Sequence, residues 1–340
     1  MKSAPESRAL LKATFLVSSV MLALAGCTSI EVGLGLRMRL DKVPVAALSA
    51  TVTPGPGLAP GQVAHLVLTA SSSDGKQWVT VGAGKGNVLF DSFTIAATTV
   101  TIDKNGAVSL AADPRVSEGA SPEVHVVVVG HQDVTADLRI PIRYDVAYVA
   151  DFACKPGFKG IDGLSGLSGS DGSPGSTDPA NPSAGGRGSD GTHGEDGRDG
   201  DAGQSGQAVH VWLTLKGGDH PLLQVRAASK TNTMLFLVDP NGGSLRVDAS
   251  GGAGGAGGTG GQGGRGGSGG SGFPPGFSGQ NGLNGADGHA GARGAAGTIV
   301  VSVDPQAQPY LSKLQLINKD GGGAPGPTPD IRVETIPPLW

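Results

Sequence analysis

Cysteine, aromatic residues and basic charge are all scarce in this 340-residue chain. The two cysteines, Cys27 and Cys154, cannot supply the set of cross-links that holds a disulfide-rich domain together. Aromatic residues make up 4% of the chain, and the formal net charge is −4, so no stripe of lysine and arginine is available to neutralise phosphates. We therefore expect neither a disulfide framework nor a nucleic-acid partner.

The motifs that carry catalysis or cofactor binding are also missing. Gly75-Lys76 is followed by Gln77, so there is no phosphate-binding loop. Residues 266–270 fit a nucleophile elbow only because a glycine repeat contains a serine. The acidic residues of 190–201 lack the apolar position of calcium-binding glycine repeats, and the histidines lack ligand spacing. We expect no enzyme, no cofactor and no metal site, and we interpret the acidic residues as a solvated face.

Glycine, in contrast, is abundant and unevenly distributed. Residues 157–206 and 251–297 contain 39 of the 60 glycines, about 40% of their length. The remaining residues are about 9% glycine, close to the usual ~7%. The chain therefore combines ordinary globular sequence with a second, glycine-patterned architecture.

The N-terminus has the layout of an export signal. Three basic residues within 1–12 precede an apolar run, 13–26, that is too short to span a bilayer as a stable helix. The run ends in Leu24-Ala25-Gly26-Cys27, a leucine and two small residues before a cysteine. This ending resembles the lipobox of bacterial lipoproteins.

That resemblance implies that residues 1–26 are a signal peptide, that Cys27 is acylated, and that residues 27–40 tether the protein to membrane lipid. Several acyl chains hold a protein firmly where one holds only marginally. Thr28 in place of aspartate implies sorting to the outer membrane. An ordinary cleaved signal is the alternative. Cys154 then has no partner within the chain; we interpret it as a small buried residue, with an intermolecular disulfide as the alternative.

Residues 41–150 have the pattern of an all-β domain. Short β-favouring runs alternate with turn residues, and Asn105-Gly106 between two runs predicts a tight hairpin. The expected strands are 63–70, 78–81, 98–103, 107–111, 123–129 and 134–140. Run 123–129 is apolar on both faces and suits an inner strand. About seven strands in this length predict an immunoglobulin-like sandwich.

Four segments keep glycine at every third position: segment 1 (157–175), segment 2 (185 or 188 to 206), segment 3 (251–272) and segment 4 (276–297). As helices of polyproline-II type, at ~3.1 Å per residue, each would span roughly 60–70 Å. Such a helix makes no internal hydrogen bonds, so its amides need partners elsewhere. Equal lengths predict that the four lie side by side.

Segment 3 differs from the others because it reads Gly-Gly-X throughout. A collagen triple helix needs one glycine per turn and abundant proline, whereas the four segments hold one proline, Pro174. With two glycines per turn, a helix has two lengthwise stripes without side chains, which suits a helix with neighbours on several sides. We hypothesise a bundle within one chain, with segment 3 at its centre and the other three packed on it. A collagen-like trimeric stalk and flexible linkers are the alternatives.

Two short links, 177–184 and 273–275, are rich in proline or asparagine and would place both reversals at one end. This pattern resembles the polyglycine-II bundles of springtail antifreeze proteins and of some phage tail-tip adhesins. The resemblance covers residues 157–206 and 251–297 and rests on periodicity. An ice- or crystal-surface function, which the springtail family implies, is a further alternative, although the outward residues are charged and irregular.

The regions 207–250 and 298–340 read as the strands of a small base domain, which the glycine helices of 151–206 and 251–297 interrupt. The expected strands are 209–216, 222–228, 233–238, 245–247, 298–303, 310–317 and 331–336. The predicted fold is therefore mainly β: a sandwich, a shaft of four glycine helices and a base.

Together these features predict an exported, lipid-anchored protein of the bacterial cell envelope, monomeric and non-enzymatic, with a structural or adhesive function. Phe273, Pro274, Pro275 and Phe277 would lie at the tip of the shaft, with Asp178 and Asn181 opposite them. Exposed aromatic residues on a rigid end suit recognition of a surface protein, matrix protein or glycan. The alternative is that the two phenylalanine rings cap the end of the bundle.

Overall fold

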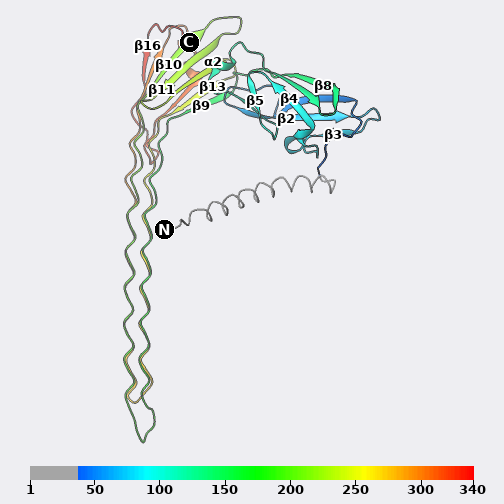
Figure 1. Cartoon of the computed structure of the whole chain (residues 1–340). Helices are drawn as coiled ribbons and strands as arrows, with labels where there is room; N and C mark the ends of the chain where they lie inside the picture. Colours follow the sequence, from blue (N-terminus) through cyan, green and yellow to red (C-terminus); the bar gives the residue numbers. More distant parts are fainter. Residues whose placement is uncertain (1–36) are drawn as a thin grey trace, which may run out of the picture. The chain divides into compact units, whose positions relative to one another are not determined.

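The computed structural model describes residues 37–340 and is mainly β, as the sequence predicts (Figure 1). The predicted signal peptide, Cys27 and most of the predicted tether lie outside the described residues. The chain forms two compact units, which divide between Tyr144 and Asp145. Within residues 37–340 no helix has the length and apolar character needed to cross a membrane.

The first unit contains two antiparallel sheets. One is ordered β1-β2-β6-β5 with β3 paired to β2, and the other is ordered β4-β7-β8. The strands are β1 (Ala47–Thr53), β2 (Val63–Ser71), β3 (Gln77–Val79), β4 (Phe93–Ala97), β5 (Val100–Ile102), β6 (Ala107–Leu110), β7 (Glu123–Val128) and β8 (His131–Arg139). Three short helical elements connect them: η1 (Gly82–Gly84), η2 (Phe90–Ser92) and α2 (Pro114–Ser117).

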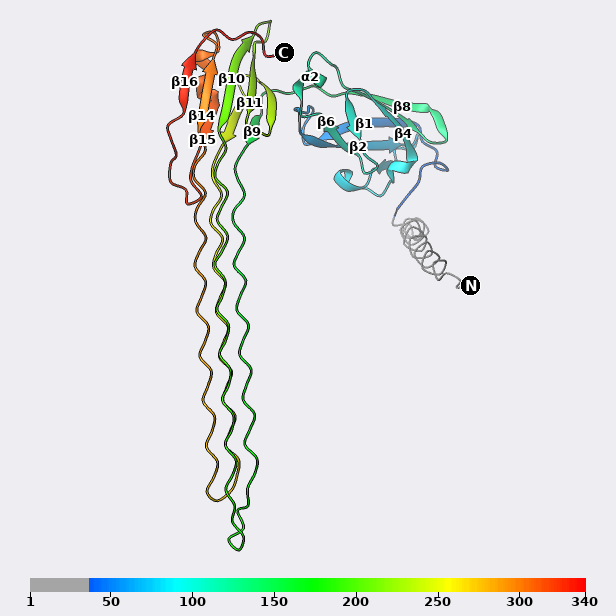
Figure 2. The ribbon, with the colours of Figure 1, turned by 60° about the vertical axis from the view of Figure 1, so that its left-hand side comes forward.

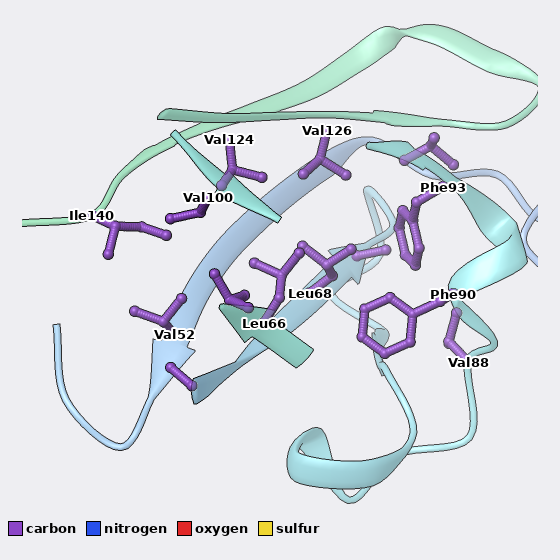
Figure 3. Packing of buried hydrophobic residues seen from close by; sticks show 14 of the residues in the cluster. Val52, Leu66, Leu68, Val88, Phe90, Phe93, Val100, Val124, Val126 and Ile140 are labelled. Carbon is purple, nitrogen blue, oxygen red and sulfur yellow. The ribbon is translucent and has the colours of Figure 1, made fainter. Parts of the chain in front are cut away.

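Alternating apolar residues of both sheets meet in one core (Figure 3). Leu66 and Leu68 of β2 and Val124 and Val126 of β7 are buried, while the residues between them are exposed or half-buried. This period of two is what a sheet with one buried face requires. β7 is an inner strand, as predicted, but only one of its faces is buried, which corrects the expectation of two apolar faces.

The predicted hairpin at Asn105-Gly106 is confirmed, because β5 and β6 pair as antiparallel neighbours across it. Gly106 has a φ of +81°, which favours glycine. The Asp103 carboxylate accepts hydrogen bonds from the amides of Asn105 and Ala107, both at 2.8 Å, and so fixes the turn.

The second unit also contains two sheets. The first has the order β15-β13-β9 and is parallel throughout; the second has the order β12-β11-β10-β14-β16. The strands are β9 (Ala147–Asp151), β10 (Val209–Lys216), β11 (Leu222–Ala228), β12 (Thr233–Val238), β13 (Ser244–Asp248), β14 (Ile299–Val303), β15 (Leu314–Ile317) and β16 (Asp330–Val333). Residues 147–150, which we assigned to the first domain without a predicted strand, lie in β9, and β9 pairs with β13 in the second unit.

The strand predicted over 310–317 begins as a 3-10 helix, η3 (Gln308–Lys313), and only its end forms β15. Pro309 is the reason, since a proline at the start of a helical turn has no amide to leave unpaired.

The glycine segments extend from two neighbouring strands of each of these two sheets (Figure 2). Segment 1 follows β9 and segment 3 follows β13, while segment 2 leads into β10 and segment 4 leads into β14. Strands β9 and β13 are parallel neighbours, and so are β10 and β14. Segments 1 and 3 therefore leave the base in the same direction, and segments 2 and 4 return to it.

Candidate functional site: the glycine shaft and its tip

Hydrogen bonding passes from the base into the shaft, which we define as segments 1 to 4, without a break. After β9 and β13 end, the amide of Phe152 donates to the carbonyl of Asp248, and the amide of Cys154 donates to Ser250. The next bond, from Gly157 to Ala253 at 2.8 Å, already belongs to the shaft and repeats at every third residue up to Gly175. The paired strands thus set the register of the glycine segments.

Five ladders of backbone hydrogen bonds connect the four segments. Segment 1 glycines donate to segment 3, segment 2 donates to segments 1 and 4, segment 3 donates to segment 2, and segment 4 donates to segment 3. At one level of the shaft the bonds are Gly163 to Thr259, Glu195 to Leu164, Gly194 to Leu283, Gly261 to Glu195 and Gly285 to Gly261, all between 2.7 and 2.9 Å. In each triplet, one amide that such a helix cannot satisfy internally, or two in segment 2, is thus satisfied by a neighbouring segment.

Segment 3 is not the only central segment, which corrects the sequence-based hypothesis. It is bonded to all three others, and so is segment 2, whereas segments 1 and 4 are each bonded only to segments 2 and 3. The cross-section is a rhombus with segments 2 and 3 on its short diagonal. Segment 2 has a single glycine stripe but bonds to three neighbours. This is possible because the residue at the second position of each of its triplets donates a backbone hydrogen bond, in addition to the glycine at the first position.

The glycines at every third position of a segment form a column along one side of it. Two segments can pack closely when only one of them presents such a column to the other, and for this reason one column is enough for segment 2. A Cβ on Gly160 would come within 3 Å of the Arg198 carbonyl in segment 2, and a Cβ on Gly197 would meet the Gly258 carbonyl in segment 3. The two columns of segment 3 face segments 1 and 4, and the column of segment 4 faces segment 2. Five columns serve five contacts, so segment 3 alone requires Gly-Gly-X.

The acidic residues of segment 2 form more than a solvated face. They are exposed, as predicted, but Asp190, Asp196 and Asp199 each accept a hydrogen bond from a segment 4 amide at 2.6–2.8 Å. His193, in the same column, accepts the amide of Leu283 through Nδ1 at 2.7 Å. Side chains at four successive third positions of the triplets therefore bind backbone that the five ladders leave free.

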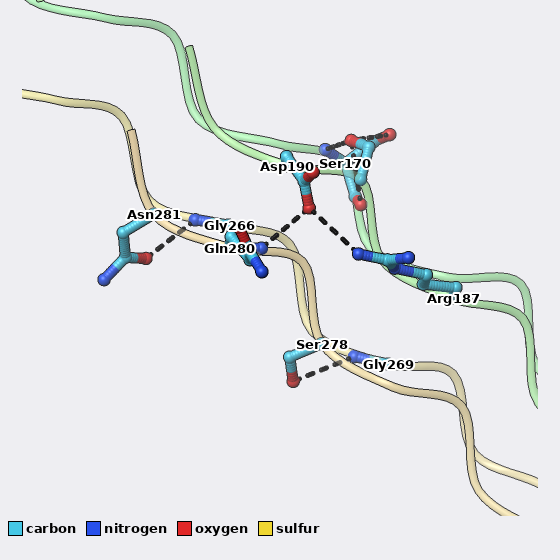
Figure 4. Close-up of polar contacts among 9 residues, drawn as sticks. Ser170, Arg187, Asp190, Gly266, Gly269, Ser278, Gln280 and Asn281 are labelled. Carbon is cyan, nitrogen blue, oxygen red and sulfur yellow. Dashed lines mark hydrogen bonds and ion pairs between the residues drawn. The ribbon is translucent and has the colours of Figure 1, made fainter. Parts of the chain in front are cut away.

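Side chains of segments 4 and 1 bind the backbone of segment 3 in the same way, and Figure 4 shows this for Asn281 of segment 4 and Gly266. Asn281, Asn284 and Asp287 accept the amides of the first glycines of three Gly-Gly-X triplets at 2.8–2.9 Å. Asp162 and Asp171 of segment 1 accept the amides of Thr259 and Ser268, both at 2.7 Å. Sequence reasoning missed this function of the side chains. Its signal is a short acceptor side chain recurring at the third position of consecutive triplets.

These bonds stabilise the charged form of the carboxylates. The Lys159 ammonium, followed by the Thr259 amide, lowers the pKa of Asp162 to about 2. The hydrogen bond from the His289 amide is the main cause that lowers the pKa of Asp199. Both carboxylates are therefore ionised over the whole neutral range and act as permanent acceptors.

The two reversals of the shaft lie together at its tip, as the sequence predicts. The Phe273 amide donates to the Ser183 carbonyl at 2.9 Å, and the Gly185 amide donates to Pro274 at 3.0 Å. Phe273 and Phe277 are 71% and 81% exposed, so their rings do not cap the end of the bundle.

Asp178 and Asn181, the predicted tip residues in the first reversal, bond within their own turn. They close it because the Asn181 amide donates to the Asp178 carbonyl and the Asp178 carboxylate accepts the Ala180 amide. Within residues 37–340, neither they nor Pro275 form a hydrogen bond to Phe273 or Phe277.

Cys154 is half-buried at the start of the shaft, where its Sγ lies 3.1 Å from the Ser205 carbonyl oxygen. Residues 37–340 contain no group of three or more histidine, cysteine or acidic side chains arranged to hold a metal ion. No family model, curated protein or solved structure matches this chain.

Proposed function

We propose that this protein is an exported, lipid-anchored component of the bacterial cell envelope that presents a rigid glycine shaft, and that it acts as a structural or adhesive protein rather than as an enzyme. Its glycine segments form a polyglycine-II bundle within one chain, and its first unit is an immunoglobulin-like sandwich. Acylated Cys27 attaches it to the lipid of the outer membrane.

One observation carries the proposal of a rigid shaft: the hydrogen bonds continue in register from the base strands to the tip. The bond from Gly157 to Ala253 and the bond from Gly175 to Ser271 belong to a single ladder. A flexible linker would not align four segments in this way. The intrachain ladders also argue against the collagen-like trimer, since the glycine columns already face segments of the same chain.

The anchoring step is tested by feeding cells a clickable fatty acid and isolating the protein. We expect label on the native chain, and no label with retention of the signal peptide in a Cys27→Ser variant. A Cys154→Ser variant is the matched control and should label fully. If the native chain is cleaved but unlabelled, the N-terminus is an ordinary secretion signal, and the anchor is excluded.

The tip is proposed as a recognition surface for a surface or matrix protein or a glycan. The exposure of Phe273 and Phe277 supports recognition over capping, because the rings are free to contact a partner. The Phe273→Ala/Phe277→Ala double variant should lose cell adhesion and partner pull-down, while Leu283→Ala, which removes an exposed leucine of segment 4 away from the tip, should retain both. Unchanged adhesion in the double variant would exclude the tip.

A further inference from the structure

Segment 1 displays a continuous ridge of large apolar side chains that no part of its own unit covers. Phe158, Ile161, Leu164 and Leu167 occupy the second position of four successive triplets and are 80%, 67%, 68% and 75% exposed. With three residues per turn they lie in one straight line, about 28 Å long at ~3.1 Å per residue. We call these four residues the apolar ridge.

Such a ridge is costly to leave in water. Each side chain carries roughly 100 Å² of apolar surface, so two ridges packed together would bury on the order of 800 Å² before their flanks are counted. That area, increased by the flanks, falls in the range of weak or transient interfaces. A partner that covers the ridge evenly must repeat with the same spacing, about 9 Å, and a second copy of this chain does so.

Two charged columns flank the ridge, one on each side. On one side lie the second-position residues of segment 2, since the amides of Asp201 and Arg198 donate to the carbonyls of Phe158 and Ile161, both at 2.9 Å. On the other side lie the third-position residues of segment 1, Lys159 and Asp162, because Asp162 reaches segment 3 at Thr259. At the level of Phe158 the flanks are therefore Asp201 and Lys159, and at the level of Ile161 they are Arg198 and Asp162.

The charges select the orientation of the two copies. A two-fold axis parallel to the shafts brings the segment 2 flank of one copy against the segment 1 flank of the other. Asp201 then faces the second copy's Lys159, and Arg198 faces its Asp162, so opposite charges meet twice on each flank. An antiparallel pair would bring Arg198 against the second copy's Glu195, which is level with Leu164, but it would also place the two Asp162 carboxylates against each other. It therefore joins fewer opposite charges than the parallel pair.

We propose that two copies of this chain pair in parallel through the apolar ridge, in register, with each ridge residue opposite its own counterpart. We expected a monomer because the sequence analysis considered only how the glycine stripes pair. The ridge lies outside those stripes. The pairing needs neither the acylation of Cys27 nor recognition at the tip, so its test is independent of the proposed function.

Single cysteines test the orientation on the full chain in a Cys154→Ser background, with a short bismaleimide and a denaturing gel. Phe158→Cys and Leu167→Cys should each cross-link to their own kind, on the order of tenfold faster or more than Leu283→Cys, an equally exposed leucine on segment 4. The background without an added cysteine shows any contribution of Cys27.

The outcomes separate cleanly. Cross-linking only when Phe158→Cys and Leu167→Cys are mixed would mean an antiparallel pair and would overturn the proposal. Rates equal to that of Leu283→Cys would mean that the ridge does not pair and would also overturn it.

A charge exchange tests the flanks. Asp201→Lys should slow cross-linking of Phe158→Cys about tenfold or more, because it opposes the second copy's Lys159, and adding Lys159→Asp should restore it. Both residues are exposed, and neither side chain contacts a backbone amide in the described shaft, so folding should persist. Lys159→Asp also removes the ion pair between Lys159 and Asp162, so Lys159→Asp alone is measured beside the double variant. Failure of the second change to restore the rate would remove the charge argument for a parallel pair.

Discussion

The two kinds of structure in this chain are held together by opposite means. The sheets of the first unit enclose a core of side chains such as Leu66 and Leu68, which are almost wholly removed from water. In segments 1 to 4 the buried residues are glycines, and the large apolar side chains are exposed. The first unit therefore depends on apolar burial, which tolerates changes of sequence that preserve volume. The shaft depends on backbone hydrogen bonds at close approach, which tolerate no added carbon.

The largest expected effect comes from a substitution in the core of the first unit. Leu68→Ala removes a fully buried side chain from the core and should lower the free energy of unfolding of the first unit by about 2–5 kcal/mol. Because the second unit has its own core, its transition should stay in place. Calorimetry that resolves two transitions checks both statements. A shift of both transitions together would show that the units do not unfold independently.

The second effect breaks the shaft. Gly261→Ala would bring a Cβ within 3 Å of the Leu164 carbonyl, where only backbone can yield, and should destabilise the second unit by about 3 kcal/mol or more. Two controls frame the result. Gln262→Ala, at the exposed position next to it, should change the stability by no more than about 0.5 kcal/mol. Gly75→Ala, in a turn of the first unit with open space around it and a φ of +85°, should cost about 1–2 kcal/mol. An unaltered second transition in Gly261→Ala would mean that the segments are not in contact.

A smaller effect concerns the side chains that accept backbone amides. Asp196→Ala leaves the Ala286 amide to water and should destabilise the second unit by about 0.5–1 kcal/mol. Asp196→Asn keeps an acceptor oxygen and should cost less. Chemical denaturation of the two variants beside the native chain measures the difference. Equal stability of Asp196→Ala and the native chain would reduce the acidic column to the solvated face that the sequence suggested.

The smallest effect is the response of the shaft to acid. The pKa values of Asp162 and Asp199 are lower in the folded chain than their usual 3.8, and that of Asp162 is about 2. Their stabilisation is therefore complete above pH ~4 and is lost as the pH falls from there towards 2. The melting temperature of the second unit should decline over this window, and less steeply in Asp162→Asn. A profile identical to that of Asp162→Asn would show that this carboxylate contributes nothing.

Much of this arrangement could be predicted from local pattern. The bounds of β10, β11 and β12 follow from apolar runs between glycine or asparagine turns, and the four segments follow from an unbroken period of three. Strands β1 and β4 were missed because Ala47–Thr53 and Phe93–Ala97 contain small or polar residues and gain their strand structure from pairing with β2 and β7.

The candidate site was harder to predict than the fold. A sequence records how many glycine columns a segment has, but not which neighbour each column faces, so the central position of segment 2 could not be read from it. The function of Asp190 and Asn281 as acceptors depends on which amide lies beside them, and that is set by the register of strands many residues away. The exposed tip, in contrast, follows from the short links alone.

Residue-resolved amide exchange across segment 3 tests most directly whether glycine backbones pair within one chain. The second glycines of the triplets, such as Gly255 and Gly264, donate to segment 2, whereas the amides of Ala256 and Gln262 have no protein acceptor in the described chain. We predict protection that rises and falls with a period of three residues. Extra protection is expected where a side-chain oxygen accepts the amide, namely at Thr259, Gly260, Gly263, Gly266 and Ser268. Uniformly fast exchange over 251–272, at the rate of an unstructured peptide, would contradict the account.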